Sequence, residues 1–150
     1  MAALGWEVDV LAPHAPGAMR REHFDDVTVE RFPYLWPTSA QTVCYQGGAL
    51  VNLRKHPLNK LKLPALVVAQ FLAMFWRMML RPYDAIHAHW LVPQGFNAVI
   101  LGKLFRKPVV VTVHGGDVFG LRGGLIDSVK RFVIKTATHV TVNSEFTGDA

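Results

Sequence analysis

The chain has 150 residues, of which 51% are hydrophobic and 18% are charged, so it can form a globular core and is not a disordered segment. Its 16 Lys and Arg residues outnumber its 11 Asp and Glu residues, but they occur in short groups instead of one block, which argues against nucleic acid as a partner. The single cysteine, Cys44, excludes an internal disulfide, and the first residues lack the pattern of a signal peptide, so we expect a cytoplasmic protein.

The first third of the chain predicts two strands and a short helix. Residues 8–12 alternate in polarity before a loop rich in Pro and Gly at 13–17, and residues 26–32 alternate again and end at a proline. Residues 37–48 show no period, and a short helix is expected around residues 49–53. These features are those of strands joined by loops.

A long helix is expected over residues 64–81. Pro64 fits its first turn, apolar residues recur at helical spacing, and Arg81 precedes the proline that closes it. We interpret its methionines and aromatic residues as core packing and not as a cofactor site.

The same apolar stretch raises the question of a membrane. Gln70 and Arg77 within it argue against a helix that spans a bilayer. Lys60 and Lys62, next to the apolar helix, instead favour an anionic membrane surface as a candidate partner, with peripheral binding at the inner membrane face.

The second half of the chain alternates between strands and helices. Strands are expected at 83–90, 108–114 and 139–143, and helices at 95–105 and 125–137. The β-branched run at 109–113 is typical of a central parallel strand buried on both faces. Short connections between alternating elements predict an α/β fold with a doubly wound, Rossmann-like parallel sheet in a single domain over residues 1–150.

Ligands of such sheets bind outside the carboxyl ends of the strands, and polar residues lie at the carboxyl ends of three of the predicted strands. His87 and His89 are two residues apart and face one side of the sheet. We favour a satisfied core histidine for His87 and expect His89 nearer the crevice. His114 lies between a buried strand and two glycines, which favours a functional role. Asp117 either accepts a hydrogen bond from a sugar hydroxyl or caps the following turn.

Two further features lie at the carboxyl ends of the second and third of these strands. Gly115 and Gly116 allow a positive φ or the close approach of a ligand to the backbone. Asn143, Ser144 and Glu145 open a predicted helix whose backbone amides can hold an anion.

Three segments carry a resemblance to a known family. They are YDAIHAHWLVPQG at 83–95, KPVVVTVHGGDV at 107–118 and ATHVTVNSE at 137–145. In this order, each with its strand, they resemble the acceptor-side N-terminal domain of family 4 glycosyltransferases of the two-Rossmann-domain (GT-B) type.

The resemblance implies a retaining transfer of a sugar from a nucleotide-sugar donor to a hydroxyl acceptor, such as a growing polysaccharide, a lipid-linked sugar or a small polyol phosphate. His114 would match the histidine that hydrogen-bonds the sugar in the transition state and is not a nucleophile. The residues implied to bind substrate are His89, Trp90, Gly115, Gly116, Asp117, Asn143, Ser144 and Glu145. No cofactor is implied, because the nucleotide-sugar is a co-substrate. No metal is implied either, because such enzymes bind the diphosphate with basic side chains and helix amides.

In that family an earlier strand with a glycine-rich loop precedes these segments, and a donor-binding domain follows them. We therefore expect the chain to be a fragment, truncated at both ends and inactive as a hexosyltransferase by itself.

Two alternatives from other classes stay open. His87, His89, His114 and Asp117 can in principle converge on a metal ion, although no tight ligand motif is present. The basic and apolar stretch at 54–80 is compatible with a membrane-surface binding module on the same Rossmann-like fold.

Overall fold

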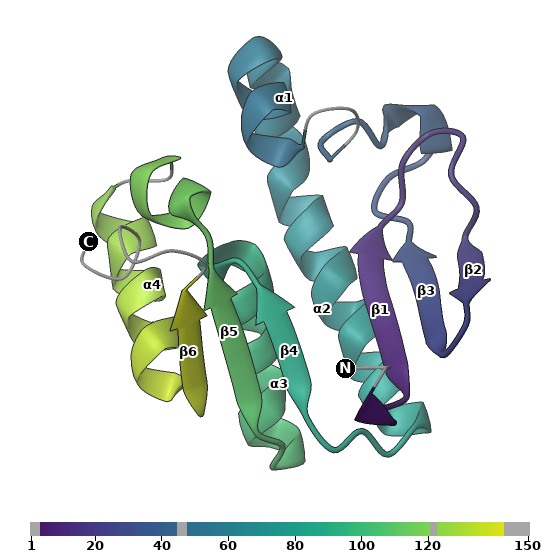
Figure 1. Cartoon of the computed structure of the whole chain (residues 1–150). Helices are drawn as coiled ribbons and strands as arrows, with labels where there is room; N and C mark the ends of the chain where they lie inside the picture. Colours follow the sequence, from purple (N-terminus) through teal and green to yellow (C-terminus); the bar gives the residue numbers. More distant parts are fainter. Residues whose placement is uncertain (1–3, 45–47, 121–122, 143–150) are drawn as a thin grey trace. The chain divides into compact units, whose positions relative to one another are not determined.

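A computed structural model describes residues 4–44, 48–120 and 123–142 of the chain, which form an α/β structure (Figure 1). The chain divides into two compact units, residues 1–73 and 74–150. Each unit contains a three-stranded sheet.

The sheet of the first unit has the strand order β1-β3-β2 and is mixed. Strand β1 (Val8–Pro13) runs parallel to β3 (Val27–Phe32), and both strands were predicted. Strand β2 (Arg21–Phe24) was not predicted and pairs antiparallel with β3. Only Asp25 and Asp26 separate β2 from β3, which suffices for a hairpin but not for a parallel crossover. Asp25 adopts a left-handed φ of 49°, which aspartate tolerates in turns.

The core of the first unit is built from residues of a strand, a loop and a helix that pack together. It contains Phe32, Tyr34, Val43 and Leu66, and the Val43 N–H donates a hydrogen bond to the Tyr34 hydroxyl at 3.0 Å. Cys44 packs against this core, and burial raises the pKa of its thiol to about 11, so the thiol stays protonated at neutral pH.

Several helical segments follow β3 along the chain. The described residues include two short 3₁₀ helices, η2 (Thr38–Ala40) and η3 (Pro57–Lys62). The predicted short helix is confirmed as α1 (Ala49–Lys55), and the predicted long helix as α2 (Leu63–Leu80).

Helix α2 is apolar on more than its packed side. Leu66, Met74 and Met78 contact core residues, which confirms core packing for part of the apolar stripe, but Met79 is 57% exposed. Val68, Leu72 and Trp76 are also exposed and recur at helical spacing. Within the helical stretch Pro57–Leu80, a window of 18 residues has a mean hydropathy of 1.7 and is 11% buried, so the length and composition of the stretch suffice to cross a membrane. That the helix does not span a bilayer stays a prediction.

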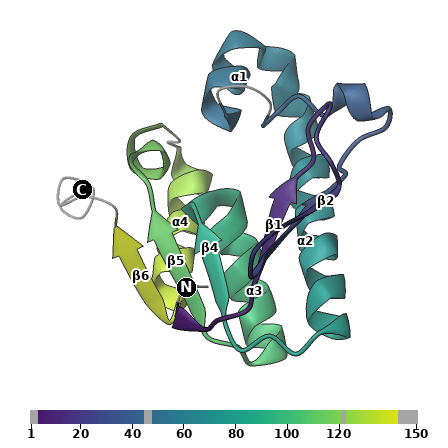
Figure 2. The same ribbon diagram turned by 45° about the vertical axis from the view of Figure 1, so that its right-hand side comes forward.

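The second unit contains the parallel sheet that the sequence predicts. Its strands are β4 (Ile86–His89), β5 (Val109–Val113) and β6 (His139–Val142), in the order β4-β5-β6 with both pairs parallel. The connecting helices are α3 (Phe96–Phe105) and α4 (Gly124–Thr136), as predicted. Figure 2 shows both helices behind the sheet in the rotated view.

Only one face of this sheet carries the core. Ile86, Ala88 and Val111 lie with residues of α3 and α4 in the buried cluster, whereas His87 and His89 point to the other face and are exposed. In β5, Val110 and Thr112 are only half-buried. The prediction that this strand is buried on both faces is therefore wrong, because α3 and α4 cover the same face of the sheet.

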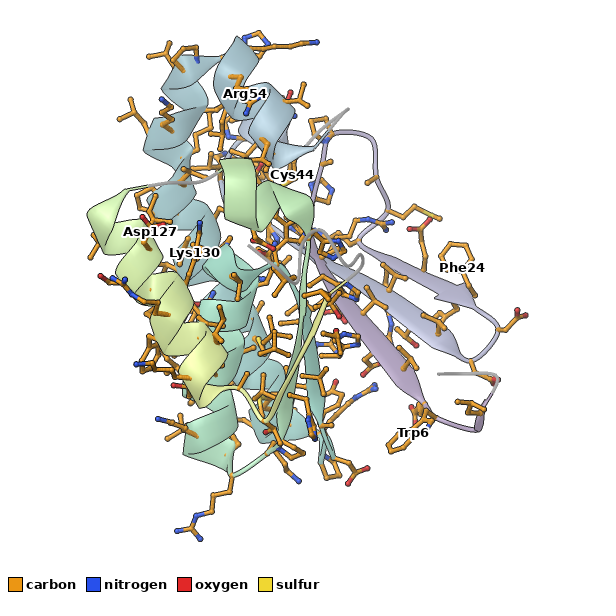
Figure 3. The ribbon with its side chains drawn as sticks, turned by 60° about the vertical axis from the view of Figure 1, so that its left-hand side comes forward. Trp6, Phe24, Cys44, Arg54, Asp127 and Lys130 are labelled. Carbon is orange, nitrogen blue, oxygen red and sulfur yellow. The ribbon has the colours of Figure 1, made fainter. Side chains whose placement is uncertain are left out.

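Helix α4 buries one of its two neighbouring basic residues, which a simple amphipathic pattern does not predict. Arg131 is exposed, but the neighbouring Lys130 is only 8% exposed and its Nζ lies 3.5 Å from Oδ1 of Asp127 (Figure 3). Lys130 can be buried because its apolar methylene groups pack inside while its charged end lies near a carboxylate.

Close contact between α3 and β5 makes one glycine a sensitive position. A Cβ at Gly102 would lie 2.2 Å from Cγ2 of Val109 and 3.0 Å from the Lys107 carbonyl oxygen. We expect Gly102→Ala to lower the free energy of unfolding by roughly 2–3 kcal/mol, because backbone as well as side chain must move. Urea denaturation measures this, with Gly124→Ala as the control, since a Cβ at Gly124 meets nothing within 4 Å. Equal stability of the two variants would contradict the packing described.

Candidate active site at the carboxyl ends of strands β4 and β5

The two histidines of β4 lie on the same exposed face, as their spacing predicts. His87 Nε2 lies 2.8 Å from the hydroxyl of Thr112, which in turn lies 2.8 Å from the hydroxyl of Thr141. His87 is therefore not the core histidine that we favoured from sequence: the alternation of β4 buries Ile86 and Ala88 and turns His87 outward. Partial burial of the ring, with His89 beside it, lowers the pKa of His87.

His89, Trp90 and His114 form one cluster where β4 and β5 end. His89 Nδ1 and His114 Nε2 are 3.3 Å apart, and the ring of Trp90 stacks on His114 with a centroid separation of 5.6 Å. The hydrogen bond between the two imidazoles requires that one of the facing nitrogens carries a proton and the other does not. Adjacent parallel strands thus bring together two histidines that are 25 residues apart in the sequence.

The backbone at Trp90 is held in an unusual conformation. Trp90 has φ 79° and ψ 139°, which a non-glycine residue rarely adopts. Its N–H donates to the Thr112 carbonyl at 2.9 Å, and its own carbonyl accepts from the Gly95 N–H at 2.9 Å. Strained residues held in this way concentrate at functional sites, so the conformation supports placing a site here.

Asp117 connects the loops that follow the two strands. Its side chain is fully buried; Oδ1 accepts a hydrogen bond from the Leu91 N–H at 3.0 Å, and Oδ2 accepts one from the His114 N–H at 3.1 Å. Desolvation raises the pKa of this carboxyl despite these backbone hydrogen bonds. Of the two roles considered from sequence, this geometry supports capping, in which the Asp117 carboxylate accepts the hydrogen bond of the His114 backbone N–H and so positions that residue.

The two glycines after His114 do not adopt the positive φ that glycine allows and that we considered from the sequence. Neither Gly115 nor Gly116 is among the residues with a positive φ, and the pair leads into a helical turn, Gly116–Gly120. The absence of side chains still leaves the backbone beside His114 open to a ligand.

The remaining predicted site residues, Asn143, Ser144 and Glu145, lie outside the described residues.

One histidine of the first unit was not considered as a candidate site residue from the sequence. His14 follows β1, is 7% exposed and has its Nε2 3.1 Å from the Ala18 carbonyl oxygen, while its Nδ1 has no partner among the described residues. Its place directly after a strand was the signal that would have found it.

The arrangement of the histidines and of Asp117 can be compared with the metal site considered as an alternative. Within residues 4–44, 48–120 and 123–142, no three side chains of His, Cys, Asp or Glu lie close enough together to hold a metal ion. His89 and His114 do approach each other, but the carboxylate of Asp117 is directed at backbone N–H groups.

The sequence profile of the glycosyl transferase 4-like domain matches residues 1–150 of the chain. The chain belongs to this family. Among curated proteins, none matches closely enough to serve as a relative. As a glycosyl transferase 4-like domain, the chain is a transferase domain whose partners are a sugar donor and an acceptor. The α/β fold with parallel strands agrees with a Rossmann-like domain of that family.

Proposed function

We propose that this glycosyl transferase 4-like domain supplies the acceptor side of a retaining hexosyltransferase, which moves a sugar from a nucleotide-sugar to a hydroxyl group during glycan, polysaccharide or glycolipid synthesis. The observation that carries the proposal is the cluster of His89, Trp90 and His114 at the carboxyl ends of two parallel strands. An imidazole and an indole face together offer a hydrogen-bonding group and an apolar surface, and a sugar presents hydroxyls and C–H groups to match them.

In this proposal His114 hydrogen-bonds the transferred sugar as charge develops in the transition state. Its position is set from two sides: Asp117 accepts the hydrogen bond of its backbone N–H, and His89 approaches its ring. A group fixed before the reaction stabilises developing charge without reorganisation, which is the main source of rate enhancement in such sites. Gly116 and Trp90 would border the same sugar.

Most of the donor nucleotide is proposed to be bound by a second, donor-binding domain. We therefore expect the 150-residue chain alone to show no transfer, whereas a protein that joins it to such a domain should be active without added metal. Residence in the cytoplasm, at or near the inner membrane face, stays a prediction of the sequence.

The proposal is tested by incubating the two-domain protein with single nucleotide-sugars and a panel of polyol, glycan and lipid-linked acceptors. Proton NMR of the product reports the anomeric configuration of the new linkage. We expect the configuration of the donor to be retained. A product with the opposite configuration would exclude the retaining mechanism, and the release of free sugar only, with every acceptor, would exclude transfer to a hydroxyl.

A further inference from the structure

The net positive charge of the chain arises in one segment, which contains no acidic residue. No Asp or Glu occurs between Glu30 and Asp84, while seven of the 16 basic residues fall there. These are Arg31, Arg54, Lys55, Lys60, Lys62, Arg77 and Arg81. The remaining nine basic residues are outnumbered by the 11 acidic ones, so this segment carries the whole positive excess.

Part of this segment lines a pocket within the first unit. The pocket has a volume of about 580 Å³, which is within the usual range for small-molecule sites. Its lining residues are Thr42, Asn52, Lys55, His56, Leu58, Asn59 and Lys62. Two lysines and a histidine thus line the pocket, and no carboxylate is among the described residues that do so.

Lys62 is fixed in this pocket by neutral groups. Its Nζ donates to the Ala40 carbonyl and to the Thr42 hydroxyl, both at 3.0 Å, and that hydroxyl donates to Oδ1 of the buried Asn59 at 3.2 Å. An ammonium group has three N–H donors, and these bonds use two of them. Neither of these partners carries a charge, so neither offsets the positive charge of the half-buried Lys62 side chain.

We propose that this pocket binds a phosphate group, with Lys62 and Lys55 supplying its charge partners and His56 a further donor. A phosphate carries up to two charges and several acceptor oxygens, so it matches two lysines on different helices better than a carboxylate does. The phosphate belongs either to a small soluble ester or to a lipid head group. Leu58 and Leu61, which are 77% and 80% exposed, provide apolar surface beside the pocket for the second case. The site does not depend on the sugar-transfer reaction proposed above and is tested without it.

Two matched pairs of variants distinguish specific binding in the pocket from a general attraction of anions to surface charge. Lys55 and Arg54 both lie in the last turn of α1 and are exposed, but only Lys55 lines the pocket; Arg54 is labelled in Figure 3. Lys62 and Lys60 likewise share η3, and only Lys62 lines the pocket. Each pair removes one positive charge from the same turn, so long-range electrostatics changes equally within a pair.

Binding of inorganic phosphate to the chain is measured by calorimetry in a chloride buffer of constant ionic strength. Lys55→Gln and Lys62→Gln are each expected to weaken the affinity about tenfold or more, as the loss of a charge-assisted hydrogen bond predicts. Arg54→Gln and Lys60→Gln are expected to change it less than about twofold. Circular dichroism checks that each variant is folded, and Lys55→Gln keeps the test valid should loss of the Lys62 hydrogen bonds disturb the loop.

The source of the phosphate is separated by a second measurement, in which glycerol phosphate competes with vesicles that contain phosphatidic acid for the chain. Displacement by glycerol phosphate indicates a soluble ester, and retention on the vesicles with the same dependence on Lys55 and Lys62 indicates a lipid. Absence of phosphate and of vesicle binding would overturn the proposal. Equal weakening by all four variants would also overturn it, because it would show a diffuse effect of charge.

Discussion

Replacing His114 by alanine is expected to lower kcat of the two-domain transferase by about 10²–10³-fold, the usual cost of removing one hydrogen-bonding group from a preorganised site. The substitution should leave the fold intact, since His114 follows β5 in a loop and is only half-buried. Turnover at saturating acceptor is the measurement, together with the urea denaturation midpoint of the same variant.

A histidine elsewhere on the same sheet provides the control. His139 begins β6 and is exposed, at the end of the sheet opposite to His114. His139→Ala should therefore keep the activity of the parent enzyme. If His114→Ala folds and turns over normally, His114 is not part of the site, and the proposed role of the cluster fails with it.

The second large effect is expected at Asp117. Asp117→Ala should lower the free energy of unfolding by roughly 2–4 kcal/mol, because the N–H groups of Leu91 and His114 then lose their buried acceptor. This is a large share of the 5–15 kcal/mol that stabilises a typical domain. Urea denaturation measures the loss, and Asp127→Ala is the matched control, with an expected cost of about 1 kcal/mol or less for a half-exposed carboxylate.

The raised pKa of Asp117 adds a dependence on pH whose sign can be stated. Above its unfolded value of 3.8 the native carboxyl holds its proton longer than the unfolded one, so the native state binds more protons. The contribution of Asp117 to stability is therefore greatest below pH 3.8 and falls as the pH rises through the native pKa. Asparagine cannot titrate, so the stability of the parent relative to Asp117→Asn should fall over this interval.

The amide resonances of Leu91 and His114 distinguish positioning from a general loss of stability. In Asp117→Asn one of the two carboxylate acceptors becomes a donor, so at least one of these resonances should shift strongly while those of β6 stay in place. Unchanged amide resonances would show that the carboxylate does not hold the two loops as described. A difference in stability that is constant with pH would show that burial does not raise the pKa of Asp117.

Elements with strong local signals were predictable from the sequence. The β-branched run at 109–113, the apolar periodicity of α2 and the alternation in β1 and β3 each specify an element through neighbouring residues alone. The spacing of His87 and His89 likewise specified that they share a face of a strand. Strand β2 escaped because it is short, polar and carries little apolar alternation, and its pairing depends on the two-residue turn that joins it to β3.

The sequence by itself therefore determined the α/β class, the order of the main helices and strands apart from β2 and, through the three ordered segments, the glycosyl transferase 4-like family. Tertiary structure alone decided which face of the second sheet is buried, that His87 is exposed, and that Asp117 holds the loops after β4 and β5. It also decided that Lys62 meets Thr42 across 20 residues of chain. The physical reason is the same in each case: periodicity and propensity act between neighbours, whereas burial and hydrogen-bond partners are set by residues brought together only when the chain folds.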